Sequence, residues 1–362
     1  MLDVSLESVS FRYDDFALRD VSVTFAKSMH TAIVGPPSCG ASTLLRLIAG
    51  EIRPQRGQVR IGTRVVNDIS ASRRPLLYVT SGLDVSGRWS VHHALVNAVR
   101  GRTLDREDRF RELSLTASKW QLEPLLERRI STLGDSERAR VHIARIELLK
   151  PAILVADRLL AGADAAAQLQ LADDFYRALR IMGSTVISAP ASTAELGLSD
   201  AIIVLDRGKV IQSGSAAHVF RSPVNEAAAV ATGQVNVVPV TISGHRVASA
   251  IGEWTLERAP FEGSGVALAR PDDFSVAVAG EDSDLIFGIE EAAFQNGQWI
   301  ARGLLTGGAA IRIALPRHFP IRKGRLIALR YDPASFTLLP REEGDQPNAM
   351  RTDVLPSMKE TR

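Results

Sequence analysis

The segment from His30 to Gly50 constrains the fold more than any other part of the sequence. An apolar run, "HTAIV", leads directly into Gly35, and a second glycine, Gly40, follows five residues later. The segment "STLLRLIAG" then repeats its apolar residues at helical intervals and ends on Gly50, a residue suited to a helix C-cap. This order predicts a buried strand, a tight glycine-rich turn and a helix.

The same order of elements is what a phosphate-binding loop requires. Glycines let backbone N–H groups turn inward onto phosphates, a lysine contacts the terminal phosphate, and a hydroxyl group binds Mg²⁺. The glycines and hydroxyls are present, but Ala41 occupies the lysine position. A strand-to-helix turn without a ligand is an alternative for this segment taken alone. The predicted nucleotide-binding residues here are Gly35, Pro36, Pro37, Ser38, Cys39, Gly40, Ala41, Ser42 and Thr43.

The first 232 residues read as one α/β domain. Two blocks of alternating apolar residues between Leu2 and Phe25 predict paired strands joined by a turn. Buried strands are predicted again at "AILVAD", "STVISA" and "DAIIVL", and the helical stretches between them indicate a mainly parallel sheet. Residues 83–150 are rich in Leu, Ala, Arg and Glu, which predicts an inserted helical subdomain.

The sequence changes character after residue 232. Short β-like runs such as "VNVVPVTISG" and "AAIRIALP" are separated by Gly, Pro and Asp. We expect residues 233–345 to form a small antiparallel barrel of the OB type. The polar tail at residues 346–362 is predicted to be disordered.

Composition excludes several classes of function. The 43 Lys and Arg residues nearly balance the 41 Asp and Glu residues, so no nucleic-acid partner is expected. The single cysteine, Cys39, excludes an internal disulfide framework and suits a reducing compartment. The N-terminus lacks the pattern of a signal peptide, and no apolar run approaches eighteen residues. We therefore expect a cytoplasmic chain that does not cross a membrane by itself.

Three further segments carry a resemblance to a known family. They are "LGDSERARVHIARIELLK", "PAILVADRLLAGAD" and "SDAIIVLDRGKVIQSGSAAHVFRSP". In this order, after the glycine loop, they resemble the nucleotide-binding subunit of an ATP-binding-cassette (ABC) transporter. The C-terminal part resembles the barrel (TOBE) domain of importer ATPases of the maltose, polyamine and ferric-iron type. The resemblance covers about residues 1–345 and implies a P-loop cassette followed by an OB-like domain.

The resemblance implies a role for each matching residue. Tyr13 corresponds to an aromatic residue that stacks on adenine, although packing within its own strand is an alternative. Ser42 and Asp157 correspond to Mg²⁺ ligands, Asp157 acting through water. Asp164 corresponds to the aspartate of a loop that crosses the dimer interface, although it also suits a helix cap.

Two more segments correspond to contacts with other subunits. The family signature, which faces the partner's γ-phosphate across the dimer, corresponds here to Leu133, Gly134, Asp135, Ser136 and Glu137. Arg88 and Trp89 fall where membrane subunits dock. An exposed Trp89 would be an interface anchor, and burial in the helical subdomain is the alternative. The nearby His92, His93 and His142 are expected to have surface or packing roles.

The departures from the family pattern concern hydrolysis. Ala41 replaces the phosphate-binding lysine, Ser81 replaces the glutamine that senses Mg²⁺, Arg158 replaces the catalytic glutamate, and Ala189 replaces the switch histidine. The glutamate and histidine act as a unit on the attacking water. No catalytic residue is therefore intact, and we expect the chain's own site to be inactive.

One replacement suggests a positive role. Arg158 is expected to project toward the γ-phosphate space and to supply the positive charge that Ala41 lacks. An ion pair with Asp157 in an empty site is the alternative. In the signature, Asp135 places a negative charge where the partner's phosphate is expected, which predicts slow turnover there.

These observations predict a nucleotide-binding-type subunit of an ABC importer, with ATP and Mg²⁺ bound weakly or not at all. Its expected partners are a paralogous active ATPase, two transmembrane permease subunits and, indirectly, an extracytoplasmic substrate-binding protein. Its expected location is the cytoplasmic face of the membrane. A regulatory or scaffold protein without a transport role, and an active ATPase with atypical motifs, are the alternatives.

Overall fold

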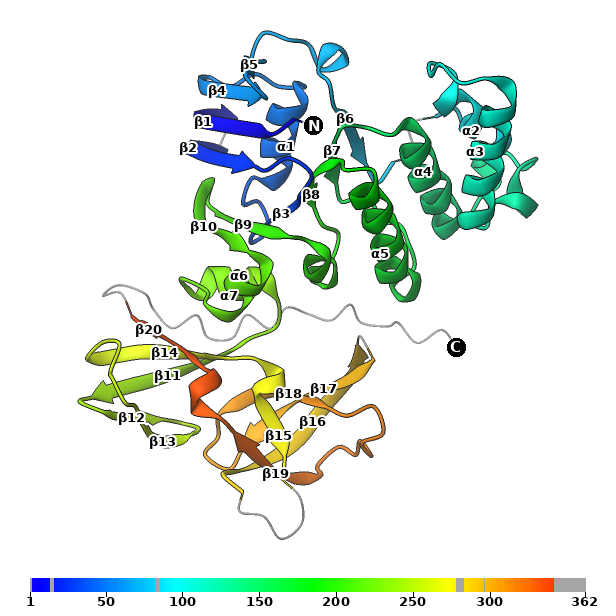
Figure 1. The fold of residues 1–362 in the computed structure, drawn as a ribbon. Helices are drawn as coiled ribbons and strands as arrows, with labels where there is room; N and C mark the ends of the chain where they lie inside the picture. Colours follow the sequence, from blue (N-terminus) through cyan, green and yellow to red (C-terminus); the bar gives the residue numbers. More distant parts are fainter. Residues whose placement is uncertain (1, 14–15, 83–84, 278–282, 296, 342–362) are drawn as a thin grey trace. The chain divides into compact units, whose positions relative to one another are not determined.

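A computed structural model describes residues 2–13, 16–82, 85–277, 283–295 and 297–341. The chain divides into two compact units, Met1–Gln234 and a second unit that begins at Val235 (Figure 1). The predicted disordered tail at residues 346–362 lies outside the described residues.

The first unit begins with a small antiparallel sheet in the order β2-β1-β4-β5. Its strands are β1 (Val4–Tyr13), β2 (Phe16–Phe25), β4 (Arg56–Ile61) and β5 (Arg64–Val65). β1 and β2 pair antiparallel with Val4 opposite Phe25, and both of these side chains are fully buried. The predicted pairing of the first two strands is therefore confirmed.

The second sheet is mainly parallel, as predicted, with the strand order β10-β9-β3-β8-β7-β6. Its strands are β3 (His30–Val34), β6 (Leu77–Thr80), β7 (Ile153–Asp157), β8 (Thr185–Ala189), β9 (Ala201–Asp206) and β10 (Lys209–Ser215). Only β10 runs antiparallel to its neighbour. The parallel strands are continuous apolar runs because helices cover this sheet. Parallel pairing also places the carboxyl ends of β3, β6, β7 and β8 at one edge.

Helices connect these strands. α1 (Ala41–Ala49) follows β3, and α5 (Ala165–Ile181) follows β7. A separate group, α2 (Val91–Val99), α3 (Arg106–Lys119) and α4 (Asp135–Leu149), forms the helical subdomain that the sequence predicts (Figure 1). The unit ends with the short helices α6 (Ala216–Arg221) and α7 (Glu226–Thr232). Short 3₁₀ turns lie at η1 (Ala71–Arg73), η2 (Glu123–Leu125), η3 (Ile130–Thr132) and η4 (Thr193–Leu198).

One buried arginine holds the C-terminal end of α1 in place. The Arg74 side chain donates to the carbonyl oxygens of Leu47 (2.8 Å) and Ile48 (2.7 Å) in the last turn of α1. It also donates to the Val66 carbonyl oxygen (2.7 Å). Carbonyls in the last turn of a helix lack the usual intrahelical partners, and although Leu47 also accepts from the Gly50 N–H (3.2 Å), Arg74 supplies a donor to both of these carbonyls. Arg74 thereby fixes α1, and with it the loop that precedes α1.

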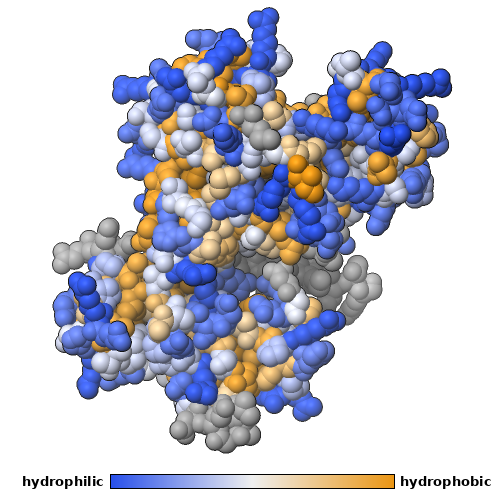
Figure 2. All heavy atoms as spheres, viewed as in Figure 1, coloured by the Kyte–Doolittle hydropathy of each residue, from blue (hydrophilic) through white to orange (hydrophobic). Residues whose placement is uncertain are grey.

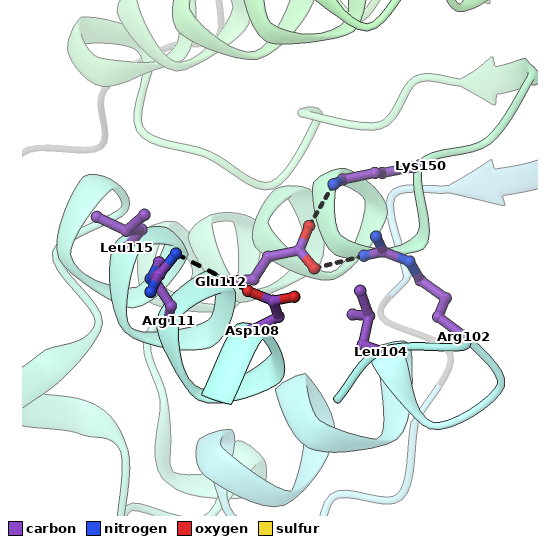
Figure 3. Close-up of a pocket in the computed structure, with 7 residues that line it drawn as sticks. All are labelled: Arg102, Leu104, Asp108, Arg111, Glu112, Leu115 and Lys150. Atoms are coloured by element: carbon purple, nitrogen blue, oxygen red, sulfur yellow. Dashed lines mark hydrogen bonds and ion pairs between the residues drawn. The ribbon is translucent and has the colours of Figure 1, made fainter. Parts of the chain in front are cut away.

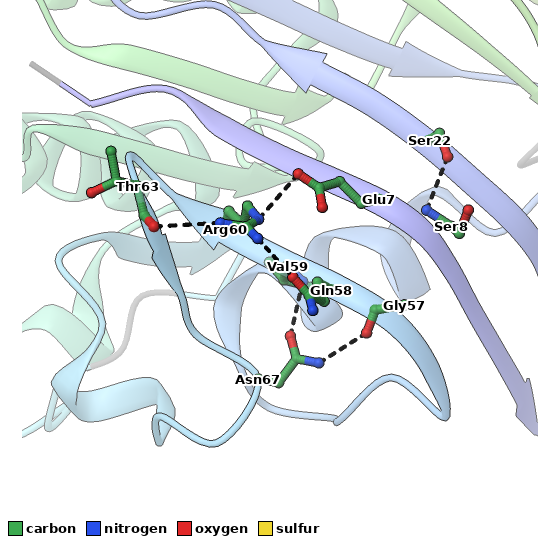
Figure 4. A network of polar contacts seen from close by, with 9 residues as sticks. All are labelled: Glu7, Ser8, Ser22, Gly57, Gln58, Val59, Arg60, Thr63 and Asn67. Atoms are coloured by element: carbon green, nitrogen blue, oxygen red, sulfur yellow. Dashed lines mark hydrogen bonds and ion pairs between the residues drawn. The ribbon is translucent and has the colours of Figure 1, made fainter.

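The loop beside β4 is held by a single asparagine (Figure 4). Asn67 accepts from the Val59 N–H (2.8 Å) and donates to the Gly57 carbonyl oxygen (3.0 Å), so it continues the β4 hydrogen-bonding pattern.

We expect Asn67→Ala to lower the free energy of unfolding by about 1–2 kcal/mol, because two half-buried backbone groups lose their partner. Urea unfolding measures this. The matched control, Thr63→Ala on the same loop, is expected to change it by less than about 0.5 kcal/mol, because the Thr63 side chain is exposed; equal effects would contradict the role of Asn67.

The second unit is built from strands, as predicted, and they form two five-stranded sheets. The first has the order β13-β12-β11-β14-β20 and the second β15-β19-β16-β17-β18. The first contains β11 (Asn236–Ser243), β12 (Arg246–Ser249), β13 (Gly252–Thr255), β14 (Gly263–Ala269) and β20 (Thr337–Pro340). The second contains β15 (Phe274–Val276), β16 (Leu285–Gln295), β17 (Gln298–Leu305), β18 (Ala310–Leu315) and β19 (Leu326–Tyr331).

Both sheets of the second unit contribute to one apolar core. Ile242 and Ala267 from the first sheet cluster with Phe287, Ile313 and Leu329 from the second. This β-rich unit is consistent with the expected OB-like domain, and its described strands pair as two sheets. Alternation of apolar residues predicts that strands bury one face but not which strand edges pair.

The surface of the helical subdomain is mainly hydrophilic on the face shown in Figure 2, with small separate apolar areas. Among the described residues, no helix is both long enough and apolar enough to cross a membrane.

Candidate functional site

The glycine-rich loop joins β3 to α1, and both of its glycines are required by packing or backbone geometry. A Cβ on Gly35 would overlap the Leu205 carbonyl oxygen, so no other residue fits there. Gly40 has a φ of 108°, in the left-handed region that favours glycine, and a Cβ there would overlap the Phe16 ring. The loop therefore has the tight backbone that the sequence predicts.

The residues between these glycines include one buried side chain. The Cys39 N–H donates to the Pro36 carbonyl oxygen (3.0 Å) and closes the turn, while Pro37 and Ser38 are exposed. Burial raises the pKa of the Cys39 thiol, which keeps it protonated and unreactive. Cys39 is thus a packing residue of the loop.

The start of α1 retains the polar features of a phosphate site without the lysine. The first N–H groups of a helix lack intrahelical partners and carry partial positive charge, and no acidic residue lies in the first turn of α1. Ala41 packs against the apolar core. Ser42 is exposed and Thr43 is half-buried. Backbone and hydroxyl groups are therefore present, and the ammonium group is absent.

Strand register brings three of the predicted positions together. Thr80 on β6 lies opposite Asp157 on β7, and Asp157 lies opposite Ala189 on β8. Ser81 directly follows Thr80. These residues, far apart in sequence, therefore meet at the edge of the parallel sheet where β3 also ends.

The Asp157 carboxylate is partly buried, and one of its oxygens makes no hydrogen bond to the described residues. Its Oδ1 is buried and has no hydrogen-bond partner among the described residues. Burial, and then the negative charge of Asp157, raises the pKa of Tyr78 to about 12. No group of three His, Cys, Asp or Glu side chains in the described ranges could hold a metal ion. A Mg²⁺ ion here would therefore depend on phosphate oxygens, Ser42 and Asp157, which fits the preference of Mg²⁺ for few protein ligands.

Arg158 occupies a strained position beside this carboxylate. Its φ is +50°, its N–H donates to the Ala189 carbonyl oxygen (2.8 Å), and its side chain is exposed. No ion pair in the described part of the chain involves Arg158. The alternative of an Arg158–Asp157 ion pair is therefore wrong for this structure, and the guanidinium is free to meet an anion.

The signature segment lies at the start of α4, where its own carboxylates form a hydrogen bond and ion pairs with neighbouring residues. Gly134 is the N-cap, and its N–H donates to Glu137 Oε2 (2.9 Å). Glu137 Oε1 also pairs with Arg128 Nη1 (3.3 Å). Asp135 forms an ion pair with Arg138. Acidic groups in the first turn stabilise a helix through its dipole, and here they also occupy the end that would otherwise attract a phosphate.

The rest of the signature contacts the next predicted site residue. Leu133 is buried, 4% exposed, in the core of the helical subdomain. Ser136 Oγ accepts from the Asp164 N–H (3.1 Å). Asp164 in turn accepts at its carbonyl oxygen from the Gln168 N–H in α5 (2.8 Å). The structure therefore brings Ser136 and Asp164 into contact.

Comparison with known proteins agrees with this geometry. The profile of the family described as "ABC transporter" matches residues 18–160. That range contains the glycine loop, the signature segment and Asp157 in the arrangement given above. Residues 18–160 of this chain therefore match the ABC transporter domain.

Its relatives are importer subunits. The cassette and the second unit together are similar to an sn-glycerol-3-phosphate import ATP-binding protein of Agrobacterium fabrum, with 27% identity over 89% of this chain and 93% of the relative. They are also similar to a molybdate/tungstate import ATP-binding protein of Pyrococcus abyssi, with 27% identity over 88% of this chain and 94% of the relative. The solved structure of CbiO1 from Clostridium perfringens, part of the ABC transporter complex CbiONQ, has a TM-score of 0.52 and 21% identity and covers 60% of this chain and 90% of that chain. The structural match supports the cassette fold alone.

Tyr13 and Trp89, two aromatic residues of the cassette, differ in how far they are exposed to solvent. Tyr13 ends β1 and is 68% exposed, so its ring is available for stacking. Trp89 is half-buried, packs against the core of the helical subdomain and contacts the His93 ring with 4.5 Å between centroids. The idea of a fully exposed Trp89 anchor therefore needs correction, because the alternative of core packing accounts for much of its surface. Arg88 is exposed beside it.

The histidines of the helical subdomain differ in their exposure to solvent. His92 and His93 are exposed on α2, whereas His142 on α4 is 4% exposed. Burial, with a further effect of Arg145, lowers the pKa of His142 to about 4. His142 is therefore neutral and packed at neutral pH.

A hollow of about 270 Å³ lies between α3 and the C-terminal end of α4 (Figure 3). Glu112 accepts from Arg102 Nη1 (2.7 Å) and pairs with Lys150, and Arg102 also donates to the Leu148 carbonyl oxygen (3.0 Å). Burial alone would raise the pKa of Glu112, but hydrogen bonds from Lys150 and Arg102 lower it below its usual value. The charged side chains of the hollow pair with one another, and Arg102 also bonds to the C-terminal end of α4. We therefore interpret the hollow as part of the packing of the helical subdomain and not as a ligand site. Its lining residues are Arg102, Leu104, Asp108, Arg111, Glu112, Leu115 and Lys150.

Some residues that shape the site were missed by sequence reasoning. The Phe16 ring lies against Gly40, and the Gly208 N–H donates to the Cys39 carbonyl oxygen (3.1 Å). Gly208 has a φ of +76°, and a Cβ there would overlap the Ala17 carbonyl oxygen. The only sequence signal was the "DRG" turn after β9, which predicts a turn but not what the turn contacts.

Proposed function

We propose that this chain is a subunit of an ABC importer that can bind nucleotide but does not hydrolyse it at its own phosphate loop, and that it pairs with a paralogous active ATPase. The observation that carries this proposal is the sheet edge around Asp157. Hydrolysis needs a group that accepts a proton from the attacking water. The side chains of Ser81, Arg158 and Ala189 at this edge provide no such group, and Asp157 is the candidate Mg²⁺ ligand.

Nucleotide binding is supported by the groups that remain. The loop amides between Gly35 and Gly40 would hold the phosphates, and Ser42 with Asp157 would hold Mg²⁺, which would neutralise phosphate charge when bound. The exposed Tyr13 would stack on the base. Arg158, which has no ion-pair partner in the described residues, would supply a cation near the terminal phosphate.

The partner ATPase would complete a second site with this chain's signature. Two carboxylates, Asp135 and Glu137, lie in the first turn of α4, and Glu137 already accepts from the Gly134 N–H. A phosphate brought to this helix end would meet an occupied donor, although Arg138 and Arg128 offset the charge of the two carboxylates. We therefore infer that the composite site turns over slowly.

Attachment to permease subunits follows from the same assignment. The relatives are import ATP-binding proteins, and CbiO1 is part of the transporter complex CbiONQ. We propose that this chain binds two transmembrane subunits at the cytoplasmic face of the membrane, with the exposed Arg88 and the rim of Trp89 at the contact. An extracytoplasmic binding protein would deliver the substrate to those subunits.

The experiment that tests this function is mass spectrometry of the proteins that co-purify, in mild detergent, with a tagged copy of the chain from its own host. We expect one intact ABC ATPase and two membrane subunits in comparable amounts. The control is an Arg88→Glu, Trp89→Ala variant, which is expected to keep the ATPase partner and lose the membrane subunits. Recovery of the chain alone, or with soluble proteins only, would overturn the importer assignment and favour a regulatory or scaffold role.

A further inference from the structure

Glu195 is a buried carboxylic acid that has no part in the proposed chemistry. It lies in η4, directly after the β8 loop, and is 3% exposed. Its Oε1 accepts two hydrogen bonds, one from Gln168 Nε2 (2.8 Å) and one from the Ala191 N–H (3.2 Å). Burial raises the pKa of Glu195, and these bonds oppose that effect. A buried carboxyl group is costly unless it is hydrogen-bonded, and here these two donors hold it together with the Ser192 backbone N–H.

One of these donors leads to the start of α5. The Gln168 N–H donates to the Asp164 carbonyl oxygen (2.8 Å), and the Asp164 N–H donates to Ser136 Oγ (3.1 Å). The side chain of Gln168 therefore bonds to Glu195 while its backbone N–H bonds to Asp164, so Ala191 and Ser136 are linked through a series of hydrogen bonds and the first turn of α5. No step in this series requires a nucleotide or another chain.

The two ends of the series belong to different parts of the cassette. Ala191 lies in the loop that begins after Ala189, at the edge of the parallel sheet that contains Asp157. Ser136 lies in the first turn of α4, which is part of the helical subdomain. The Glu195 end of this network is buried, whereas Asp164 and Ser136 meet at an exposed contact. Hydrogen-bonded networks can couple their two ends when an element between them is shared, and here that element is the start of α5.

We propose that Gln168 and Glu195 are positioning residues that couple the loop after β8 to the signature turn of α4, through Asp164. This inference goes beyond the proposed function, because it concerns the free chain. Loosening the loop at one end should loosen the signature turn at the other, although the two ends are not in direct contact.

Hydrogen–deuterium exchange of the full-length chain without nucleotide, at pH 7, tests the coupling. Gln168→Leu keeps the size of the side chain and removes its donor. We expect peptides covering 189–195 and 133–137, together with the Asp164 amide, to exchange roughly tenfold faster, because the loop loses its bond to α5 and the start of α5, which holds Ser136 through Asp164, is loosened with it. The matched control is Gln170→Leu, two residues along the same helix, where the side chain contacts only Asp174 among the described residues and is exposed. It should leave both segments unchanged.

A conservative variant separates coupling from simple loss of stability. Glu195→Gln keeps an oxygen that can accept from both Gln168 and Ala191, so its exchange should match the parent at both ends. If Gln168→Leu does not fold, Gln168→Asn shortens the side chain by one methylene and provides the same comparison. Faster exchange confined to α5, to one end only, or shared equally by Gln170→Leu would overturn the proposal.

Discussion

Lowering the pH from 7 to 5 is expected to reduce the free energy of unfolding of the first unit by about 4 kcal/mol, with about 2 kcal/mol from each of two buried histidines. Burial lowers the pKa of both His30 and His142 from 6.5 to about 4. His30 is enclosed by a hydrogen bond to Ser188 Oγ (2.8 Å) and by the Tyr176 ring, stacked at 4.1 Å.

The sign follows from the order of the pKa values. Between pH 6.5 and 4 the histidines bind protons in the unfolded chain and remain neutral in the folded chain, so acid favours unfolding. Their stabilising contribution is full above pH 6.5 and is lost as the pH falls toward 4. Glu195 acts in the opposite direction, because burial raises its pKa and its proton uptake favours the folded chain.

Urea unfolding at both pH values measures the effect. Replacing Trp254 and Trp299 with Phe leaves tryptophan emission only from Trp89 and Trp120 in the first unit. In this background His142→Leu should reduce the difference between pH 7 and 5 by about 2 kcal/mol, whatever its effect on stability at pH 7. The control His92→Leu replaces an exposed histidine and should leave the difference unchanged. An unaltered pH difference in the His142 variant would contradict the assignment.

Restoring a lysine at position 41 is expected to raise the affinity for a fluorescent ATP analogue roughly 10- to 100-fold, the size of one charge-assisted contact with phosphate. The loop that would present this lysine is already formed by Gly35 and Gly40. Hydrolysis should nevertheless stay at background in Ala41→Lys, because Arg158 and Ala189 still provide no proton acceptor. Equilibrium titration and phosphate release measure the two quantities separately.

Matched variants identify the source of the change. Ala41→Met adds a side chain of similar length without charge and should leave the affinity near that of the parent. Arg158→Ala should lower the affinity if this guanidinium meets the terminal phosphate. Equal gains from Lys and Met, or phosphate release by Ala41→Lys, would contradict the account of the site.

Most elements could be predicted because their signals are local. Alternation from Leu2 to Phe25, the apolar run before Gly35 and the helical spacing after Gly40 each indicate one element within a short window. The strand order within the second unit could not be predicted, because the residue pattern of a strand does not specify which strand it pairs with. The half-buried state of Trp89 was also left open, since an apolar residue next to an arginine suits a core or an interface equally.

Residue types and their spacing were enough to predict the cassette, its order of elements and the substitutions at positions 41, 81, 158 and 189. These properties depend on residue type and spacing along the chain. Three features became visible only in the folded chain: Asp157 Oδ1 has no hydrogen-bond partner among the described residues, the Gly134 N–H donates to Glu137, and Gln168 donates to Glu195. Hydrogen bonding and burial depend on distances between atoms that folding brings together, and no local pattern specifies those distances.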